Sequence, residues 1–352
     1  MKKGVELIER LALAFGPTSC EGEVVSAIKE ELEGLPVELF EDRMGNLTAH
    51  VKGPEGAPRI MLSAHTDEVG FMVSEIEDTG MLRFSKLGGI DNSVLLGKRV
   101  TVGDGRVRGV ISSTPFHLIE KDKRCDTPSD GALYIDIGAN SEKEAAQLVS
   151  LGDFATFESE FLELGAYKIK GKALDDRAGA FIMTELLRRL YTEGGRPDFD
   201  LVLAFTVREE LGYSGAGVIA ARENPNAAIV LETTAIADIF GTPEHKRVAE
   251  QGGGAVISAL DRSSIYPRDA VEYALDCAKR HGIPAQIKKF ISGGNDAAHI
   301  GKTLDGIKVL AMSLPTRYLH SPACVVDKRD ISSMLEHVYC IITDPKTKEA
   351  LL

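Results

Sequence analysis

Basic charge, long hydrophobic runs and paired cysteines are all scarce in this sequence. The chain has 53 acidic and 41 basic side chains, and its formal net charge is −12. A protein that neutralises nucleic-acid phosphates needs a basic face, so this balance argues against a polyanion partner. We therefore expect no nucleic-acid partner.

The longest apolar stretches are too short for a membrane span. None approaches the roughly 18 to 20 residues that a transmembrane helix needs. An apolar run follows two lysines at the N-terminus, but Glu6 and Glu9 interrupt it at helical spacing. This pattern predicts an amphipathic helix of the mature fold rather than a signal peptide. We expect no membrane partner and a soluble, cytoplasmic protein.

The cysteines follow no disulfide or zinc-binding pattern. There are five, an odd number, at irregular spacings and without a CxxC pair. A disulfide framework or a cysteine-rich zinc site would show paired spacings. Reduced thiols in a cytoplasm are the simplest interpretation.

The first third of the chain begins with helical patterns and continues with strands. The predicted elements are helices at 4–15 and 20–35 and strands at 37–40, 46–51 and 59–64. The second helix is opened by the capping pattern Thr18-x-x-Glu21. The last strand is an apolar run that ends at His65, which indicates a buried strand.

The middle of the chain has a different pattern of hydrophobic and turn residues. Short alternating segments are separated by glycine and aspartate turns, which is typical of a small all-β unit. The predicted elements are strands at 70–74, 99–102, 107–111 and 133–137 and one helix at 141–148. We interpret residues 69–163 as an inserted, small β-barrel-like domain.

An alternation of helices and strands resumes after about residue 164. The predicted helices are 178–191, 214–222, 267–281 and 328–343, and the predicted strands are 201–207, 228–231, 285–290 and 308–314. This order implies an α/β fold with a mostly parallel sheet and helices on both faces. The main domain would comprise residues 1–68 and 164–352.

Polar residues with metal-binding chemistry follow several of the predicted strands. They are His65, Glu209, Glu210, Glu232 and His320. Open α/β sheets place their ligand sites in the crevice outside the carboxyl ends of the strands. Segments far apart in the sequence are therefore expected to converge on one edge of the sheet.

Asp175 and Asp176 precede the predicted helix at 178–191. Their carboxylates would lie at a helix N-terminus, on the same side as the strand ends. One of the two could simply cap the helix, which is the commoner role of an aspartate there. The convergence of the other polar residues favours a functional role for this pair.

Two histidines with four or five carboxylates are the ligand types that a pair of divalent metals requires. A site with a single metal ion would not use all of these potential ligands. Glu209 and Glu210 leave an extended strand in different directions, so one could bind metal while the other faces a reacting water. The alternative for this pair alone is a solvated surface location. Of the remaining histidines only His299 is expected near the site, and no nucleotide-binding motif is present.

Four motifs carry a resemblance to a known family. They are SAHTDEVG (63–70), LDDRAG (174–179), VREELG (207–212) and PTRYLHSP (315–322). With these motifs the chain resembles the glutamyl aminopeptidases and tetrahedral (TET) aminopeptidases, di-metal peptidases of which some members are labelled endoglucanases. The resemblance covers nearly the whole chain. It implies a phosphorylase/hydrolase-like catalytic domain with an inserted domain that helps subunits assemble, often into a dodecamer.

The resemblance also implies a role for each residue of the site. His65 and Glu232 would bind one metal, Glu210 and His320 the other, and Asp175 would bridge the two. Glu209 would be the general base, and Asp67 would orient His65. The ions would be zinc, with cobalt or manganese as alternatives, and the substrates would be peptides.

The sequence departs from the family pattern at Glu232, where aspartate is commoner, and at Asn295, where threonine is commoner. Other functions stay open at this point. A deacylase or deacetylase could use the same metals on a small amide. A cellulase needs two carboxylates beside a glycosidic bond and leaves the histidines without a role. A scaffold that has lost its chemistry would not need every one of these residues.

Overall fold

The computed structural model describes residues 2–352 and is built around an eight-stranded mixed sheet. The strand order is β1 (Glu38–Glu41), β2 (Leu47–Val51), β12 (Asp200–Thr206), β3 (Arg59–His65), β13 (Ala227–Ala235), β16 (Lys308–Thr316), β14 (Ala255–Ile257) and β15 (Ala285–Ile287). The four central strands, β12, β3, β13 and β16, are parallel to one another. Their residues are almost entirely buried, as expected for strands that are covered on both faces.

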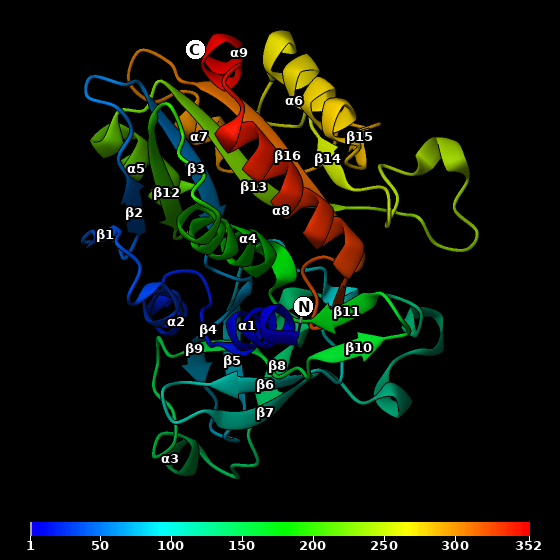
Figure 1. Cartoon of the computed structure of the whole chain (residues 1–352). Helices are drawn as coiled ribbons and strands as arrows, with labels where there is room; N and C mark the ends of the chain where they lie inside the picture. Colours follow the sequence, from blue (N-terminus) through cyan, green and yellow to red (C-terminus); the bar gives the residue numbers. More distant parts are fainter. Residues whose placement is uncertain (1) are drawn as a thin grey trace.

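Helices cover both faces of this sheet. Figure 1 shows α4 (Leu174–Glu193) and α8 (Lys328–Thr343) in front of the sheet, with α5 (Ser214–Glu223) and α7 (Ala297–Ile300) behind it. Helices α1 (Lys2–Leu13) and α2 (Gly22–Leu32) pack on α4, and α6 (Arg268–His281) packs on α8 beside the short α9 (Thr347–Leu351). The resulting core is continuous from α1 to the C-terminal helices.

A closed six-stranded barrel interrupts the α/β chain after β3 (Figure 1). Its strand order is β4 (Gly70–Ile76), β5 (Leu82–Leu87), β8 (Tyr134–Asp136), β7 (Val107–Ser112), β6 (Arg99–Val102) and β9 (Phe154–Phe157). The barrel has its own core, in which Phe71 meets Phe157 edge to face with ring centroids 5.2 Å apart. The predicted fold class, an α/β sheet with an inserted β-barrel, is confirmed.

A small sheet connects the barrel to the main sheet. It comprises β10 (Leu162–Leu164), β11 (Lys168–Gly171) and β17 (Cys324–Asp327). Strand β11 leads directly into α4, and β17 leads into α8. The two helices that cover the front face therefore both begin at this sheet.

Some predicted elements were wrong in detail. The helix predicted at 141–148 is a single turn, α3 (Glu142–Ala145), and the strand predicted at 285–290 ends at Ile287. Thr18 does not cap α2, because its hydroxyl is buried without a hydrogen-bond partner among the described residues. Instead Glu21 occupies the N-cap position, and its carboxylate accepts a hydrogen bond from the Ser19 N–H. All five cysteines are free thiols, as expected.

A buried charged cluster fixes the end of α1 against α4. The guanidinium of Arg177 is fully buried and donates hydrogen bonds to the carbonyl oxygens of Leu11, Ala14 and Gly16. It also lies 3.6 Å from the carboxylate of Glu68, which is paired with the buried ammonium of Lys172. The cluster satisfies carbonyl groups that the end of a helix otherwise leaves without partners.

Candidate active site

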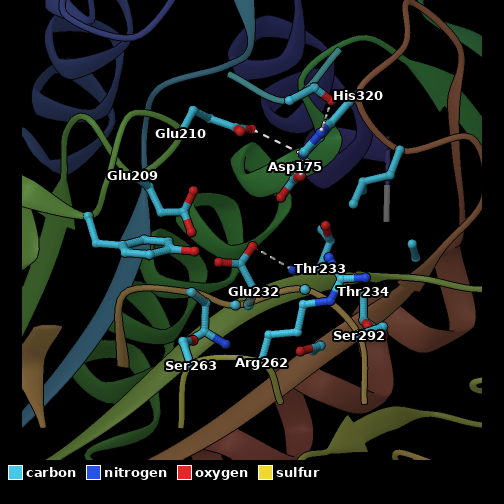
Figure 2. A pocket seen from close by; sticks show the side chains of 18 of the residues that line it. Asp175, Glu209, Glu210, Glu232, Thr233, Thr234, Arg262, Ser263, Ser292 and His320 are labelled. Atoms are coloured by element: carbon cyan, nitrogen blue, oxygen red, sulfur yellow. Dashed lines mark hydrogen bonds and ion pairs between the residues drawn. The ribbon is translucent and has the colours of Figure 1, made fainter. Parts of the chain in front are cut away.

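The seven residues predicted for the site meet at the carboxyl edge of the central strands. His65 ends β3, Glu209 and Glu210 follow β12, and Glu232 lies within β13. The other three are Asp67, Asp175 and His320. Five of the seven border a cavity of about 400 Å³: Asp175, Glu209, Glu210, Glu232 and His320 (Figure 2). His65 and Asp67 are buried beneath it.

Asp175 lies between the two histidines. Its Oδ1 is 3.4 Å from Nε2 of His65, and its Oδ2 is 3.3 Å from Nε2 of His320. Each oxygen of this one carboxylate thus faces a different imidazole. A carboxylate in this position can bind two metal ions at once, one with each histidine.

Asp176, rather than Asp175, has the helix-capping role that the sequence allowed for one of these two aspartates. Its Oδ1 accepts a hydrogen bond from the Gly179 N–H, 3.0 Å away, at the first regular turn of α4. Burial raises the pKa of this carboxyl group, and the nearby charge of Glu232 adds to the effect. Asp176 therefore caps the helix, while Asp175 faces the cavity.

Each histidine has one further carboxylate beside Nε2 and a hydrogen-bond acceptor beside Nδ1. Glu232 Oε1 is 3.6 Å from Nε2 of His65, and Glu210 Oε1 is 3.5 Å from Nε2 of His320. On the other side of the rings, Nδ1 of His65 lies 3.1 Å from the Asp67 carbonyl oxygen, and Nδ1 of His320 lies 2.8 Å from the Gly89 carbonyl oxygen. An N–H donated from Nδ1 leaves the Nε2 lone pair free for a metal.

Asp67 organises more of the site than His65 alone. Its Oδ1 is 3.4 Å from His65 Nδ1 and accepts a hydrogen bond from the Glu209 N–H at 3.0 Å, while its Oδ2 accepts one from the Glu210 N–H at 3.1 Å. Burial alone would raise the pKa of Asp67, but the hydrogen bonds and charge of His65 and the two N–H groups outweigh it and lower the pKa. Asp67 thus holds a histidine and both glutamates in one arrangement.

The donor set fits divalent metal ions. Three groups of residues bring potential ligand atoms within 4.8 Å of one another: His65, Asp175 and Glu232; Asp175, Glu210 and His320; and His65, Glu209 and Glu210. Burial, with repulsion from Asp175, raises the pKa of Glu210 to about 7 and that of Glu232 to about 8. Burial and mutual repulsion therefore disfavour the charged carboxylates, and bound cations would stabilise them. Imidazole with carboxylate is a ligand set that suits zinc.

Several cavity residues were not predicted from the sequence. They are Tyr213, Arg262, Ser263, Lys288 and Ser292. They come from loops rather than from the ends of apolar strands, so only the family motif beside Tyr213 offered a signal. His299, which was expected near the site, is exposed and contacts it through Tyr213, with ring centroids 5.5 Å apart.

Asn295, one of the two departures from the family pattern, is buried at the edge of the cavity. Its side-chain N–H donates to the Tyr266 hydroxyl at 3.2 Å and its side-chain oxygen accepts from the Ala297 N–H at 2.9 Å. The amide thus ties the start of α7 to the loop that carries Tyr266.

A covered α/β sheet with a buried histidine and carboxylate cluster at its carboxyl edge is the arrangement of a metal-dependent hydrolase. Comparison with known proteins specifies the class further. The family model of the M42 glutamyl aminopeptidases matches residues 45–336. The chain belongs to this family and is an aminopeptidase, a hydrolase that acts on peptide bonds.

Relatives in the family differ in the substrate for which they are named. The chain is 28% identical to the lysyl aminopeptidase of Pyrococcus furiosus, over 92% of this chain and 90% of the relative. It is also 28% identical to the glutamyl aminopeptidase of Lactococcus lactis, over 94% of this chain and 93% of the relative.

Solved structures with the same fold include a TET aminopeptidase from the archaeon Thaumarchaeota archaeon SCGC AB-539-E09. It is 35% identical, with a TM-score of 0.95 and coverage of 100% and 99% of the two chains. The TET1 peptidase of Pyrococcus horikoshii, which can assemble into a tetrahedron or a large octahedral shell, is 33% identical, with a TM-score of 0.86 and coverage of 97% and 99%. A Thermotoga maritima structure described as an endoglucanase is 32% identical, with a TM-score of 0.81 and coverage of 98% and 99%.

Proposed function

We propose that this chain removes N-terminal residues from peptides with two divalent metal ions, zinc in the first instance, and with Glu209 as the general base. The observation that carries the proposal is the position of Asp175, whose two oxygens face the Nε2 atoms of His65 and His320. His65 and Glu232 would hold one ion, and Glu210 and His320 would hold the other. Two such ions lower the pKa of a bound water and polarise the scissile carbonyl.

Glu209 is suited to moving the proton. Glu209 borders the cavity and is largely buried, and its backbone N–H donates a hydrogen bond to the carboxylate of Asp67. Burial raises its pKa well above the usual range, and the charges of Glu232 and Glu210 add to the effect. Glu209 would accept a proton from the attacking water and deliver it to the leaving amine.

Glu232 would reach its metal from a constrained side chain. Its Oε1 accepts a hydrogen bond of 2.8 Å from the N–H of the next residue, Thr233. This contact turns the longer glutamate back toward its own strand and keeps the carboxylate beside His65. The same acidic side of the cavity would receive the free α-amine of the peptide, which restricts cleavage to the first bond.

We also propose that the chain works in the cytoplasm as a large homo-oligomer, a dodecamer. In the part of the chain that the structure describes, no helix is long and apolar enough to cross a membrane. A related structure, PhTET1-12s, is a dodecamer. The inserted domain, residues 69–163, would contribute to this assembly.

A substrate panel tests the proposal. Metal-stripped and metal-restored protein would be assayed with aminoacyl p-nitroanilides, N-acetyl amino acids and cellulose. We expect hydrolysis of the p-nitroanilides only, with activity lost on stripping and recovered with zinc, cobalt or manganese. Hydrolysis of N-acetyl amino acids alone would indicate a deacylase. Cellulose hydrolysis that survives a chelator would indicate a glycosidase.

A further inference from the structure

The part of the cavity that faces the two histidines is acidic, and another part of the same cavity is basic and rich in hydroxyl groups. Arg262 and Lys288 line this basic part together with Ser263, Ser292 and Thr234. Figure 2 shows the Arg262 side chain extending past Glu232 toward Thr233 and Thr234, inside the cavity. The carboxylates Asp175, Glu209 and Glu210 lie farther away in the same view.

The backbone of Arg262 is held by a hydrogen bond, whereas its guanidinium has no protein partner among the side chains that the structure describes. Its backbone N–H donates a hydrogen bond of 2.9 Å to the Gly293 carbonyl oxygen, which joins two loops of the cavity wall. Within residues 4–352 its guanidinium makes no ion pair and no hydrogen bond, whereas the nearby Arg268 pairs with Glu272. A guanidinium that lines a cavity and is not paired with a protein carboxylate is available to a ligand carboxylate.

Lys288 places a second cation in the lining of the same cavity. Its Nζ donates to the Ser292 carbonyl oxygen at 2.7 Å, which ties the half-buried ammonium to another residue of the cavity lining and uses one of its three N–H donors. Burial lowers its pKa, and the charges of Asp261 and Glu232 oppose that change, which places Lys288 within electrostatic range of the site.

The carboxylates near Arg262 and Lys288 have other partners. Asp261 accepts hydrogen bonds from the N–H groups of Ser263 and Ser264, at 2.8 and 2.7 Å, and from the Tyr266 hydroxyl at 2.6 Å. The four carboxylates that line the cavity, Asp175, Glu209, Glu210 and Glu232, match the four positive charges of two divalent ions. With metals bound, no carboxylate that lines the cavity is left over to pair with Arg262 or Lys288, and Asp261, whose charge acts on Lys288, lies outside the lining.

We infer that the basic part of the cavity receives the side chain of the N-terminal residue, and that Arg262 and Lys288 select an acidic one, glutamate or aspartate. The inference rests on the proposed function and adds the substrate class. Membership of the family does not decide this point, because the relatives include one named for lysine and one named for glutamate. The Ser292 hydroxyl, which has no hydrogen-bond partner among the described residues, would donate a further hydrogen bond to the ligand carboxylate.

The test compares two substrates that differ only in charge. Metal-loaded protein is assayed with the glutamyl and glutaminyl amides of 7-amino-4-methylcoumarin, which have no terminal carboxylate to compete for the two cations. We expect a kcat/KM ratio of glutamyl to glutaminyl above about ten in the parent protein. Arg262→Gln and Lys288→Met should each lower that ratio about ten-fold, and Arg262→Lys should recover part of it.

Matched control variants come from the same region. Arg268→Gln removes an exposed arginine that is paired outside the cavity, and Lys289→Met removes the exposed neighbour of Lys288. Neither residue lines the cavity, so neither change should alter the ratio. Arg262→Glu should favour lysyl over glutamyl amide. A parent protein that prefers glutaminyl or leucyl amide, or a ratio unaffected by Arg262→Gln, would overturn the inference and leave the aminopeptidase intact.

A binding measurement separates failure of this inference from failure of the proposed function. If no aminoacyl amide is hydrolysed, the proposed function is wrong. The shift in melting temperature on addition of L-glutamate or L-glutamine still tests the pocket in that case. A larger shift with glutamate in the parent, lost in Arg262→Gln, supports the acidic pocket, and equal shifts reject it.

Discussion

At the scale of single residues, Glu209 and Glu210 have the same side chain but different surroundings. Both border the cavity, but the Glu210 carboxylate lies 3.5 Å from Nε2 of His320, whereas the Glu209 carboxylate forms no ion pair among the described residues. Glu209→Gln keeps the shape and removes the base, so kcat should fall about 10²- to 10⁴-fold. Metal content, measured by mass spectrometry of the purified protein, should stay at the parent level. Loss of metal together with activity would make Glu209 a ligand instead.

Asp67 should control metal affinity although it faces no metal itself. In Asp67→Asn the single amide oxygen can accept only one of the hydrogen bonds from the Glu209 and Glu210 N–H groups, and the amide N–H₂ opposes the other donor. The negative charge 3.4 Å from Nδ1 of His65 is also lost. Metal affinity should fall about 10- to 100-fold, as measured by competition with a chelating dye. Asp330→Asn, a buried aspartate on α8 that accepts from Gly252 and Gly254, is a control that should leave metal affinity unchanged.

Glu21 should make stability depend on pH. Burial, with the charge of Asp67, raises its pKa to about 7, although it accepts hydrogen bonds from the N–H groups of Ser19 and Arg208. Between the ordinary value of 4.5 and about 7 the folded protein holds this proton while the unfolded chain releases it. The free energy of unfolding should therefore fall as the pH rises through this range, by about 2 kcal/mol from this group.

Glu21→Gln removes this titration and should flatten that slope. The measurement is urea unfolding at pH 5 and pH 7.5, with a chelator present in both. Equal slopes for parent and variant would contradict the assignment.

At the scale of helices and strands, Arg177 is the residue on which the docking of α1 depends. Arg177→Met removes the donors to Leu11, Ala14 and Gly16 and leaves Glu68 with one cation fewer. The cost should be about 3–5 kcal/mol of unfolding free energy, because buried acceptors and a buried charge lose their partner. Thermal and urea unfolding would measure it.

Arg188→Met is the matched control on the same helix. Arg188 is half-buried and pairs with Glu31 and Glu185 near the surface. A change of about 1 kcal/mol or less is expected there. If the two variants lost the same stability, the buried cluster would have no special role.

The central strands could be predicted from the sequence because each is an apolar run long enough to be recognised alone. Their order along the chain also predicted that His65, Glu209 and Glu232 end on one edge of the sheet. The three-residue strand β14 (Ala255–Ile257) was not predicted, because it is too short to have a pattern of its own and exists through pairing with distant segments. Arg262 and Lys288 escaped prediction for the same reason, since only the folded loops bring them to the cavity.

At the scale of the whole molecule, we predict that twelve copies of the chain assemble into one particle. The native mass, measured by light scattering and native mass spectrometry, should be twelve times that of one chain. A monomer or dimer that retains full activity would show that the larger assembly is not required for catalysis.

The hydrogen bond from His320 to the Gly89 carbonyl oxygen makes the inserted barrel part of the site. Gly88 and Gly89 follow β5, and a Cβ at Gly88, where φ is +92°, would lie 2.7 Å from Val69 Cγ1. The barrel therefore is not an interchangeable module. Any graft, shuffling or deletion of the barrel must preserve the backbone path at these two glycines, or His320 loses the acceptor that orients its ring.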